Sequence, residues 1–168
     1  RSFADEKKMK TFRLLLSSPV PLIEIVLGKF LACMIVVIVM ILASSYSMGF
    51  LFLLGNPEIG PIVTGYLGVI LMAGCYVSVG VFASSLTDNQ IVAAVLTFGF
   101  SLFMWVIGWG AQAAGATTGQ VLQFLSIVDH MDRFLKGMVD TSDLVYYLSF
   151  ILLSLFLCHR VLDSNRWR

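Results

Sequence analysis

The segment from Asp5 to Lys29 organises the chain, and it reads DEKKMKTFRLLLSSPVPLIEIVLGK. It is the one charge-dense stretch ahead of a sequence that is almost wholly apolar. Met9, Phe12 and Leu16 share one helical face at this spacing, while the lysines between residues 7 and 10 lie largely away from it. The first half of the segment therefore predicts a short, basic, amphipathic helix.

Two prolines, Pro19 and Pro21, end this helix because proline lacks an N–H and disfavours helical geometry in the residue before it. Between residues 29 and 129 the only charged residues are Glu58 and Asp88. Of the 168 residues, 58% are hydrophobic and 12% are charged, against about 25% charged in a typical soluble protein. This composition predicts an all-α integral membrane protein.

Uncharged stretches long enough to cross a bilayer core of ~30 Å predict four membrane spans. They cover residues 30–54, 62–86, 91–111 and 144–162. Turn-forming residues around Asn56 and Pro57 separate the first two spans, and the polar run 87–90 separates the next two.

Residues 120–138 predict an external amphipathic helix that is too polar to cross the bilayer. Its acid-first pairs at i, i+4 are Asp129 with Arg133 and Asp132 with Lys136. After it, the run 140–143 resembles an N-cap with an acidic residue three positions later, at the start of the last span.

His130 lies between acidic residues in this helix, and two interpretations are open. Either it belongs to a metal or proton site, or it lies on a solvated helix face outside the membrane. A metal is disfavoured because a zinc site needs three or four convergent ligands and no second histidine is near.

The Lys and Arg residues predict the orientation of the spans. Six of the eleven precede residue 30, while Arg160, Arg166 and Arg168 lie at the other end of the chain. Four spans place both ends on the same side, so we expect both ends of this chain in the cytoplasm.

Neither a catalytic, a metal nor a cofactor site is predicted. Cys33, Cys75 and Cys158 are widely spaced in apolar runs. The pair Gly28-Lys29 lacks the flanking glycine and hydroxyl residue of an ATP-binding phosphate loop. The sequence has no basic patch with interleaved aromatics, so a nucleic-acid partner is not indicated.

The segment 5–29 resembles the cytoplasmic coupling segment of ABC-2 type transporter permeases. The residues that carry this resemblance are Glu6, Lys7, Lys8, Thr11, Leu14, Leu15, Ser18, Pro19, Glu24, Ile25, Leu27, Gly28 and Lys29. The resemblance implies a type V exporter-like transmembrane domain over residues 1–168, made of a coupling helix and four spans. It also implies that residues 1–28 are the coupling segment, and that N-terminal spans of the whole protein precede this chain.

Segments 84–90, 125–134, 137–149 and Arg166-Trp167 are similar to the gliding-motility-type subfamily. This similarity implies a multi-pass permease of the bacterial inner membrane that exports a substrate and is not itself an enzyme. The implied partners are a cytoplasmic ABC ATPase, which would hold ATP and Mg²⁺, a second permease copy or paralogue, and the lipid bilayer. The implied ATPase-coupling residues are Glu6, Lys7, Lys8, Thr11, Leu15, Pro19, Glu24, Gly28 and Lys29.

Two other functions stay open. A membrane scaffold would anchor an envelope or gliding-motility complex without moving a solute, and its contact surface would be the external helix. A channel or secondary carrier is disfavoured because such proteins usually keep an ionisable residue within the membrane, facing their pathway.

Overall fold

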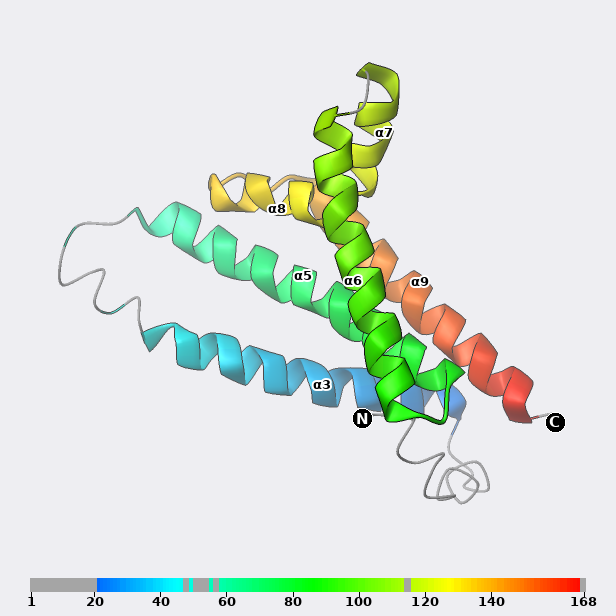
Figure 1. The fold of residues 1–168 in the computed structure, drawn as a ribbon. Helices are drawn as coiled ribbons and strands as arrows, with labels where there is room; N and C mark the ends of the chain where they lie inside the picture. The colour runs from blue at the N-terminus through cyan, green and yellow to red at the C-terminus, as the bar shows by residue number, and fades with distance from the viewer. Residues whose placement is uncertain (1–20, 47–48, 50–54, 56–57, 114–115, 167–168) are drawn as a thin grey trace.

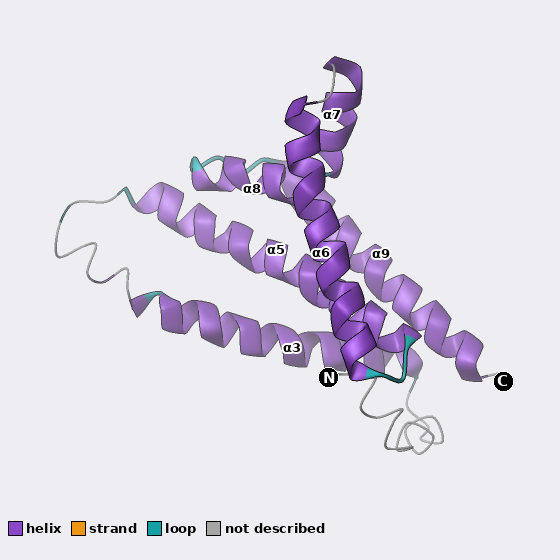
Figure 2. Cartoon of the chain, in the orientation of Figure 1, coloured by secondary structure: helices purple, strands orange, loops and turns teal. Residues whose placement is uncertain are grey.

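The computed structural model describes residues 21–46, 49, 55, 58–113 and 116–166. These residues form helices, with no strand among them (Figure 2). In chain order the helices are α3 (Leu22–Ser44), α5 (Ile59–Leu86), α6 (Gln90–Ala113), α7 (Ala116–Leu125), α8 (Ile127–Leu135) and α9 (Thr141–Arg166). The predicted all-helical class is confirmed.

Four of the described helices are long and apolar enough to cross a membrane. They are Leu22–Ser44, Ile59–Leu86, Gln90–Gly110 and Thr141–Ser164. At 1.5 Å per residue, each matches or exceeds the ~30 Å of a bilayer core. The four predicted spans each overlap one of these helices.

The first of these helices begins earlier than the sequence predicted. We expected a span from Phe30, but α3 begins at Leu22, directly after Pro21 in an extended conformation. Glu24 and Lys29 therefore belong to the first two turns of the apolar helix. Pro21 does not oppose a helix that starts directly after it, because proline disfavours helical geometry in the residue that precedes it.

Helix α5 is central and packs against α3, α6, α8 and α9. At one end of the bundle, the start of α3 and the ends of α5 and α9 come together (Figure 1). A buried apolar cluster joins them, made of Leu22, Val26, Val81, Leu155, Cys158 and Leu162. The start of the first described span and the end of the last one therefore lie at the same end of the bundle.

At the opposite end, α8 lies across the bundle against α5 and α6 (Figure 1). A second buried cluster holds it there, made of Cys75, Ile127, Met131, Phe134 and Tyr147. Met131 and Phe134 approach α5 at Gly68, where the absence of a side chain leaves room for them.

The predicted external helix 120–138 is wrong as a single helix, because the structure divides it into α7 and α8 at Ser126. Ser126 has an extended backbone, and its Oγ accepts a hydrogen bond from the Asp129 N–H at 3.2 Å. A serine in this role starts a new helix because it satisfies one of the free N–H groups of the first turn.

Helix α8 ends at a left-handed glycine, Gly137, with φ of 80°. The Gly137 N–H bonds to Phe134 O and the Met138 N–H bonds to Arg133 O, both at 3.1 Å. These two bonds form a Schellman motif, which satisfies carbonyl groups left free at a helix end. The chain then turns directly into α9, so a helix across the bundle is followed at once by a spanning helix.

Candidate functional site

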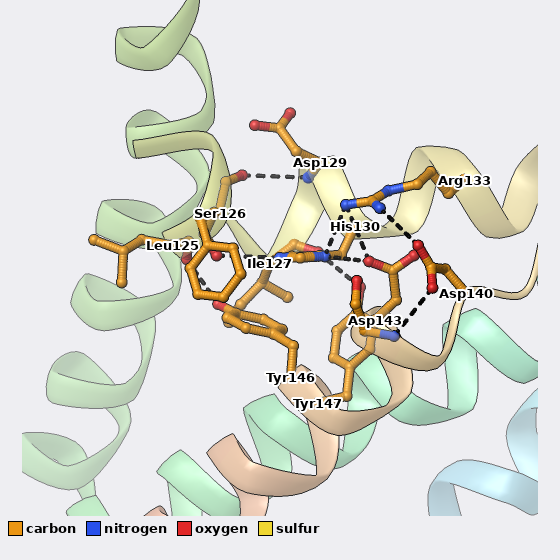
Figure 3. A network of polar contacts seen from close by, with 12 residues as sticks. Leu125, Ser126, Ile127, Asp129, His130, Arg133, Asp140, Asp143, Tyr146 and Tyr147 are labelled. Atoms are coloured by element: carbon orange, nitrogen blue, oxygen red, sulfur yellow. Dashed lines mark hydrogen bonds and ion pairs between the residues drawn. The ribbon is translucent and has the colours of Figure 1, made fainter. Parts of the chain in front are cut away.

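A buried polar network joins α8 to the first turn of α9 (Figure 3). At its centre, the His130 Nδ1 lies 2.5 Å from the Asp143 Oδ1. His130 is 1% exposed and Asp143 is fully buried. The other ring nitrogen, Nε2, lies 3.1 Å from the carbonyl oxygen of Phe124 in α7. His130 therefore connects three helices through its two nitrogens.

Arg133 adds a guanidinium group from α8 to this network. Its Nη2 lies 3.1 Å from the Asp143 Oδ1, and its Nη1 lies 3.4 Å from the Asp140 Oδ2. The Asp140 Oδ1 also accepts the Ser142 N–H at 3.2 Å, so Asp140 caps α9 as the sequence predicted. Two basic side chains of α8 thus meet two carboxylates from the beginning of α9.

The predicted acid-first pairs within the external helix are wrong. Arg133 forms its ion pairs with aspartates at the start of α9 and not with Asp129. The described side chains of Asp132 and Lys136 do not pair with each other. Asp129 lies beside α6: a Cβ placed on Gly108 would be 3.8 Å from its Oδ1. Gly137 lets the chain fold back after α8, which gives Arg133 neighbours that helical spacing does not predict.

The interpretation of His130 as part of a solvated helix face is also wrong, because this residue is buried. The described residues contain no group of three or more His, Cys, Asp or Glu side chains arranged to hold a metal ion.

Aromatic rings enclose the histidine. The Tyr146 ring stacks on the His130 ring with centroids 4.1 Å apart, and Phe124 and Tyr147 meet it edge-on. The two tyrosine hydroxyls donate to backbone oxygens on either side of Ser126, Tyr146 to Leu125 O and Tyr147 to Ile127 O, each at 2.7 Å. The first two turns of α9 thereby fix the corner between α7 and α8.

A separate groove of about 550 Å³ lies between α3, α5 and α6. Its walls are mainly apolar and include Cys33, Gly80 and Phe98. The hydroxyls of Thr97 and Ser101 in this wall each bond to a carbonyl of their own helix at 2.8 Å. Such a surface suits an apolar group better than a polar one, because two of its polar atoms are already paired.

Comparison with known proteins identifies the family. A family model described as ABC-2 family transporter protein matches residues 1–162. The chain belongs to the ABC-2 transporter family. No curated protein and no solved structure matches it. ABC-2 permeases are transmembrane components, generally not enzymes themselves, and generally work with an ATPase subunit.

Most of the coupling residues predicted for this ABC-2 protein lie outside the described part of the chain: Glu6, Lys7, Lys8, Thr11, Leu15 and Pro19. Glu24, Gly28 and Lys29 lie in the first two turns of α3. Glu24 and Gly28 are exposed on one face, and Lys29 is half-buried. The buried Leu22 and Val26 pack the start of α3 against the ends of α5 and α9.

Sequence reasoning missed three members of the ABC-2 protein's polar network: Asp143, Tyr146 and Tyr147. Asp143 was identified only as an acidic residue in the first turn of α9. The available signal was the close sequence of basic residues in α8, a glycine turn and two aspartates before an apolar helix. That order folds the aspartates back onto α8, provided that the glycine ends the helix.

Proposed function

We propose that this ABC-2 protein is the membrane-spanning permease subunit of an exporter that a separate cytoplasmic ATPase drives. The observation that carries the proposal is the family match over residues 1–162, together with four helices apolar enough to cross a membrane. ATP and Mg²⁺ would bind to the partner. The permease would work beside a second copy or a paralogue in the bacterial inner membrane, and its closest functional class would be the gliding-motility-type permeases.

The distribution of charge supports an external energy source. Between Phe30 and Val128 the only acidic or basic residues are Glu58 and Asp88, and both lie at helix ends or in connections. A carrier coupled to ions or protons usually keeps such a residue within its spans, facing the pathway. ATP hydrolysis on a partner removes that requirement.

The positions of the helix ends support an orientation. The start of α3 and the end of α9 lie at one end of the bundle, and the basic residues of the sequence are concentrated next to them. We assign this end to the cytoplasm because loops rich in Lys and Arg stay on that side. Both ends of the chain would then be cytoplasmic, and α7 and α8 would lie at the outer face.

Movement would enter through the segment that precedes α3. Leu22 and Val26 pack against Leu155, Cys158 and Leu162 of α9. A displacement of the segment by an ATPase would therefore act on α3 and, through this cluster, on α5 and α9. The exposed Glu24 and Gly28 would face the partner, together with the predicted coupling residues that precede them.

The test is co-purification of the protein with its ATPase, followed by measurement of ATP hydrolysis in lipid nanodiscs. A double charge reversal, Glu6→Lys with Lys8→Glu, should weaken binding and reduce the stimulation of ATP hydrolysis. Lys136→Glu is the matched control, because Lys136 lies at the other end of the bundle. A protein that binds no ATPase would refute the proposal, and binding without any effect on ATP hydrolysis would favour the scaffold.

A further inference from the structure

The connection between α5 and α6 places an acidic residue between two exposed apolar ones. Leu86 ends α5 and is 51% exposed, and Ile91 in the first turn of α6 is 72% exposed. Asp88 lies between them, is exposed, and is the one charged residue of the run 86–91. Together with the rest of the connection, these residues line a hollow of about 650 Å³. An apolar surface with one acidic residue is therefore exposed at this end of the bundle.

Local hydrogen bonds hold the shape of this connection. The Asn89 N–H donates to the Thr87 Oγ1 at 3.2 Å, and the Ile91 N–H donates to the Asn89 Oδ1 at 2.9 Å. These oxygens are thereby engaged within the connection itself. Binding of another group to the hollow therefore depends on apolar contact with Leu86 and Ile91 and on the negative charge of Asp88.

The segment that precedes α3 ends close to this connection (Figure 1). Leu22, the first residue of α3, is buried in a cluster with Val81 of α5. Val81 lies five residues before Leu86, which is about 7.5 Å along the helix. The run 17–21 can extend over about 17 Å. The part of the chain before residue 17 can therefore reach the hollow while it stays joined to α3.

The sequence of that segment complements the connection. Residues 1–20 lie outside the described part of the chain. The spacing of Met9, Phe12 and Leu16 predicts a short helix with an apolar face there. Arg13 lies at the edge of that face, since it is one turn from both Met9 and Leu16. An apolar face with a cation at its edge matches an apolar hollow with an acid, and arginine binds a carboxylate through two N–H groups.

We propose that the basic amphipathic segment before α3 docks on the connection between α5 and α6. Phe12 packs against Leu86 and Ile91, and Arg13 pairs with Asp88. Docking is favourable because it removes the apolar side chains on both sides from water. The segment then contacts α5 and α6 in addition to being joined to α3. A movement of the segment thereby reaches α6, which contributes no residue to the buried cluster at the start of α3.

The docking goes beyond the proposed function, because it is a contact within one chain and needs no ATPase. Arg13 is not among the predicted ATPase-coupling residues, so substitutions at this position leave those residues in place. Loss of docking with retained ATPase binding, or the reverse, tells the two proposals apart.

The experiment is disulfide cross-linking of the protein in lipid nanodiscs, without an ATPase and with copper–phenanthroline as the oxidant. Phe12→Cys is combined with Ile91→Cys, and the linked peptides are identified by mass spectrometry. A disulfide requires Cα atoms within about 7 Å of each other. We expect a link between the two new cysteines of one chain. Peptide identification distinguishes it from links that involve Cys33, Cys75 or Cys158.

Two matched pairs control for random collision. Lys10→Cys with Ile91→Cys should form no link, because Lys10 lies on the helix face opposite Phe12 and a helix is ~10–12 Å across. Phe12→Cys with Ile59→Cys should form none either. Ile59 is similarly exposed, but it begins α5 at the other end of the bundle.

A charge exchange tests the ion pair. In the cross-linking pair, Asp88→Arg should lower the yield of the link about two- to fivefold, as loss of an exposed ion pair implies. Arg13→Asp added to that variant should restore the yield. Lys10→Asp added instead should not, because Lys10 lies on the opposite face of the helix.

Met9→Cys in place of Phe12→Cys keeps the Phe12 ring, and a link from either position to Ile91→Cys supports docking. The proposal is overturned if neither position links, since the segment then lies on the lipid surface. It is also overturned if Lys10→Cys links as readily, or if mixing of two differently tagged chains shows that the link joins two copies. Failure of Arg13→Asp to restore the yield would overturn the pairing with Asp88.

Discussion

Gly68 of α5 lies so close to Phe134 of α8 that a Cβ on Gly68 would stand 2.8 Å from the Phe134 Cβ. The same position would also be 2.8 Å from the Met131 sulfur. Real Cβ atoms do not approach this closely, so α8 reaches α5 only because residue 68 has no side chain. This contact, together with the polar network, holds α8 across the end of the bundle.

Gly68→Ala should therefore destabilise the protein. Forcing a methyl group into this contact costs about 1–3 kcal/mol, offset in part by the better helix propensity of alanine. We expect a lower midpoint of thermal unfolding in detergent. Gly99→Ala is the matched control, because a Cβ there has nothing within 4 Å and should leave stability unchanged or raised. Equal effects of the two substitutions would contradict the close contact.

Tyr147→Phe should cost more stability than Tyr146→Phe. Both hydroxyls donate to a backbone oxygen at 2.7 Å, but the Tyr147 bond is buried and the Tyr146 bond is exposed. Water replaces the lost partner only at the exposed site, so the buried carbonyl of Ile127 loses a hydrogen bond without compensation. We expect about 1–2 kcal/mol for Tyr147→Phe, measured by denaturant unfolding. A larger effect from Tyr146→Phe would show that burial does not set the difference.

Thr64→Val should weaken the attachment of α8 to α5. The Thr64 hydroxyl lies 2.7 Å from Phe134 O, and valine keeps the shape of the side chain while it removes the donor. We expect a loss of about 0.5–1.5 kcal/mol and faster amide exchange at the end of α8. The control is Thr97→Val, whose hydroxyl bonds within its own helix to Ala93 O at 2.8 Å. That variant should leave α8 unaffected.

Gly137→Ala should disturb the turn from α8 into α9. The backbone of Gly137 has φ of 80°, a conformation that costs an L-residue with a Cβ about 1–2 kcal/mol. Gly137→Asn should cost less, because asparagine tolerates this conformation better than alanine does. Circular dichroism during thermal unfolding measures both. If alanine and asparagine prove equivalent, the left-handed turn is not what limits substitution here.

Much of the fold follows from simple features of the sequence. The long uncharged runs predict four spans and their overlap with α3, α5, α6 and α9. The polar run at residues 87–90 predicts the break before α6, where Asn89 Oδ1 accepts the Ile91 N–H at 2.9 Å. These features are local, since a helix satisfies its own backbone and a membrane span requires only length and apolar composition.

The polar network did not follow from the sequence, because its partners come from different helices. Helical spacing paired Arg133 with Asp129, whereas the structure pairs it with Asp140 and Asp143. The difference originates at Gly137, which ends α8 and lets the chain fold back, so that Asp140 and Asp143 meet Arg133. The coupling residues from Glu6 to Pro19 stay a prediction, since they lie outside the described residues.

The sequence by itself determined that this is an all-helical membrane protein with basic residues concentrated near both ends. It also determined the four spans that the described helices contain. Hydropathy and charge are properties of single segments, and they decide for each segment separately whether it can cross the bilayer. Only the tertiary structure decided that His130 is buried and that it faces Asp143. The reason is that the burial of a polar group depends on which other helices supply its hydrogen-bond partners, and spacing along one segment does not contain that information.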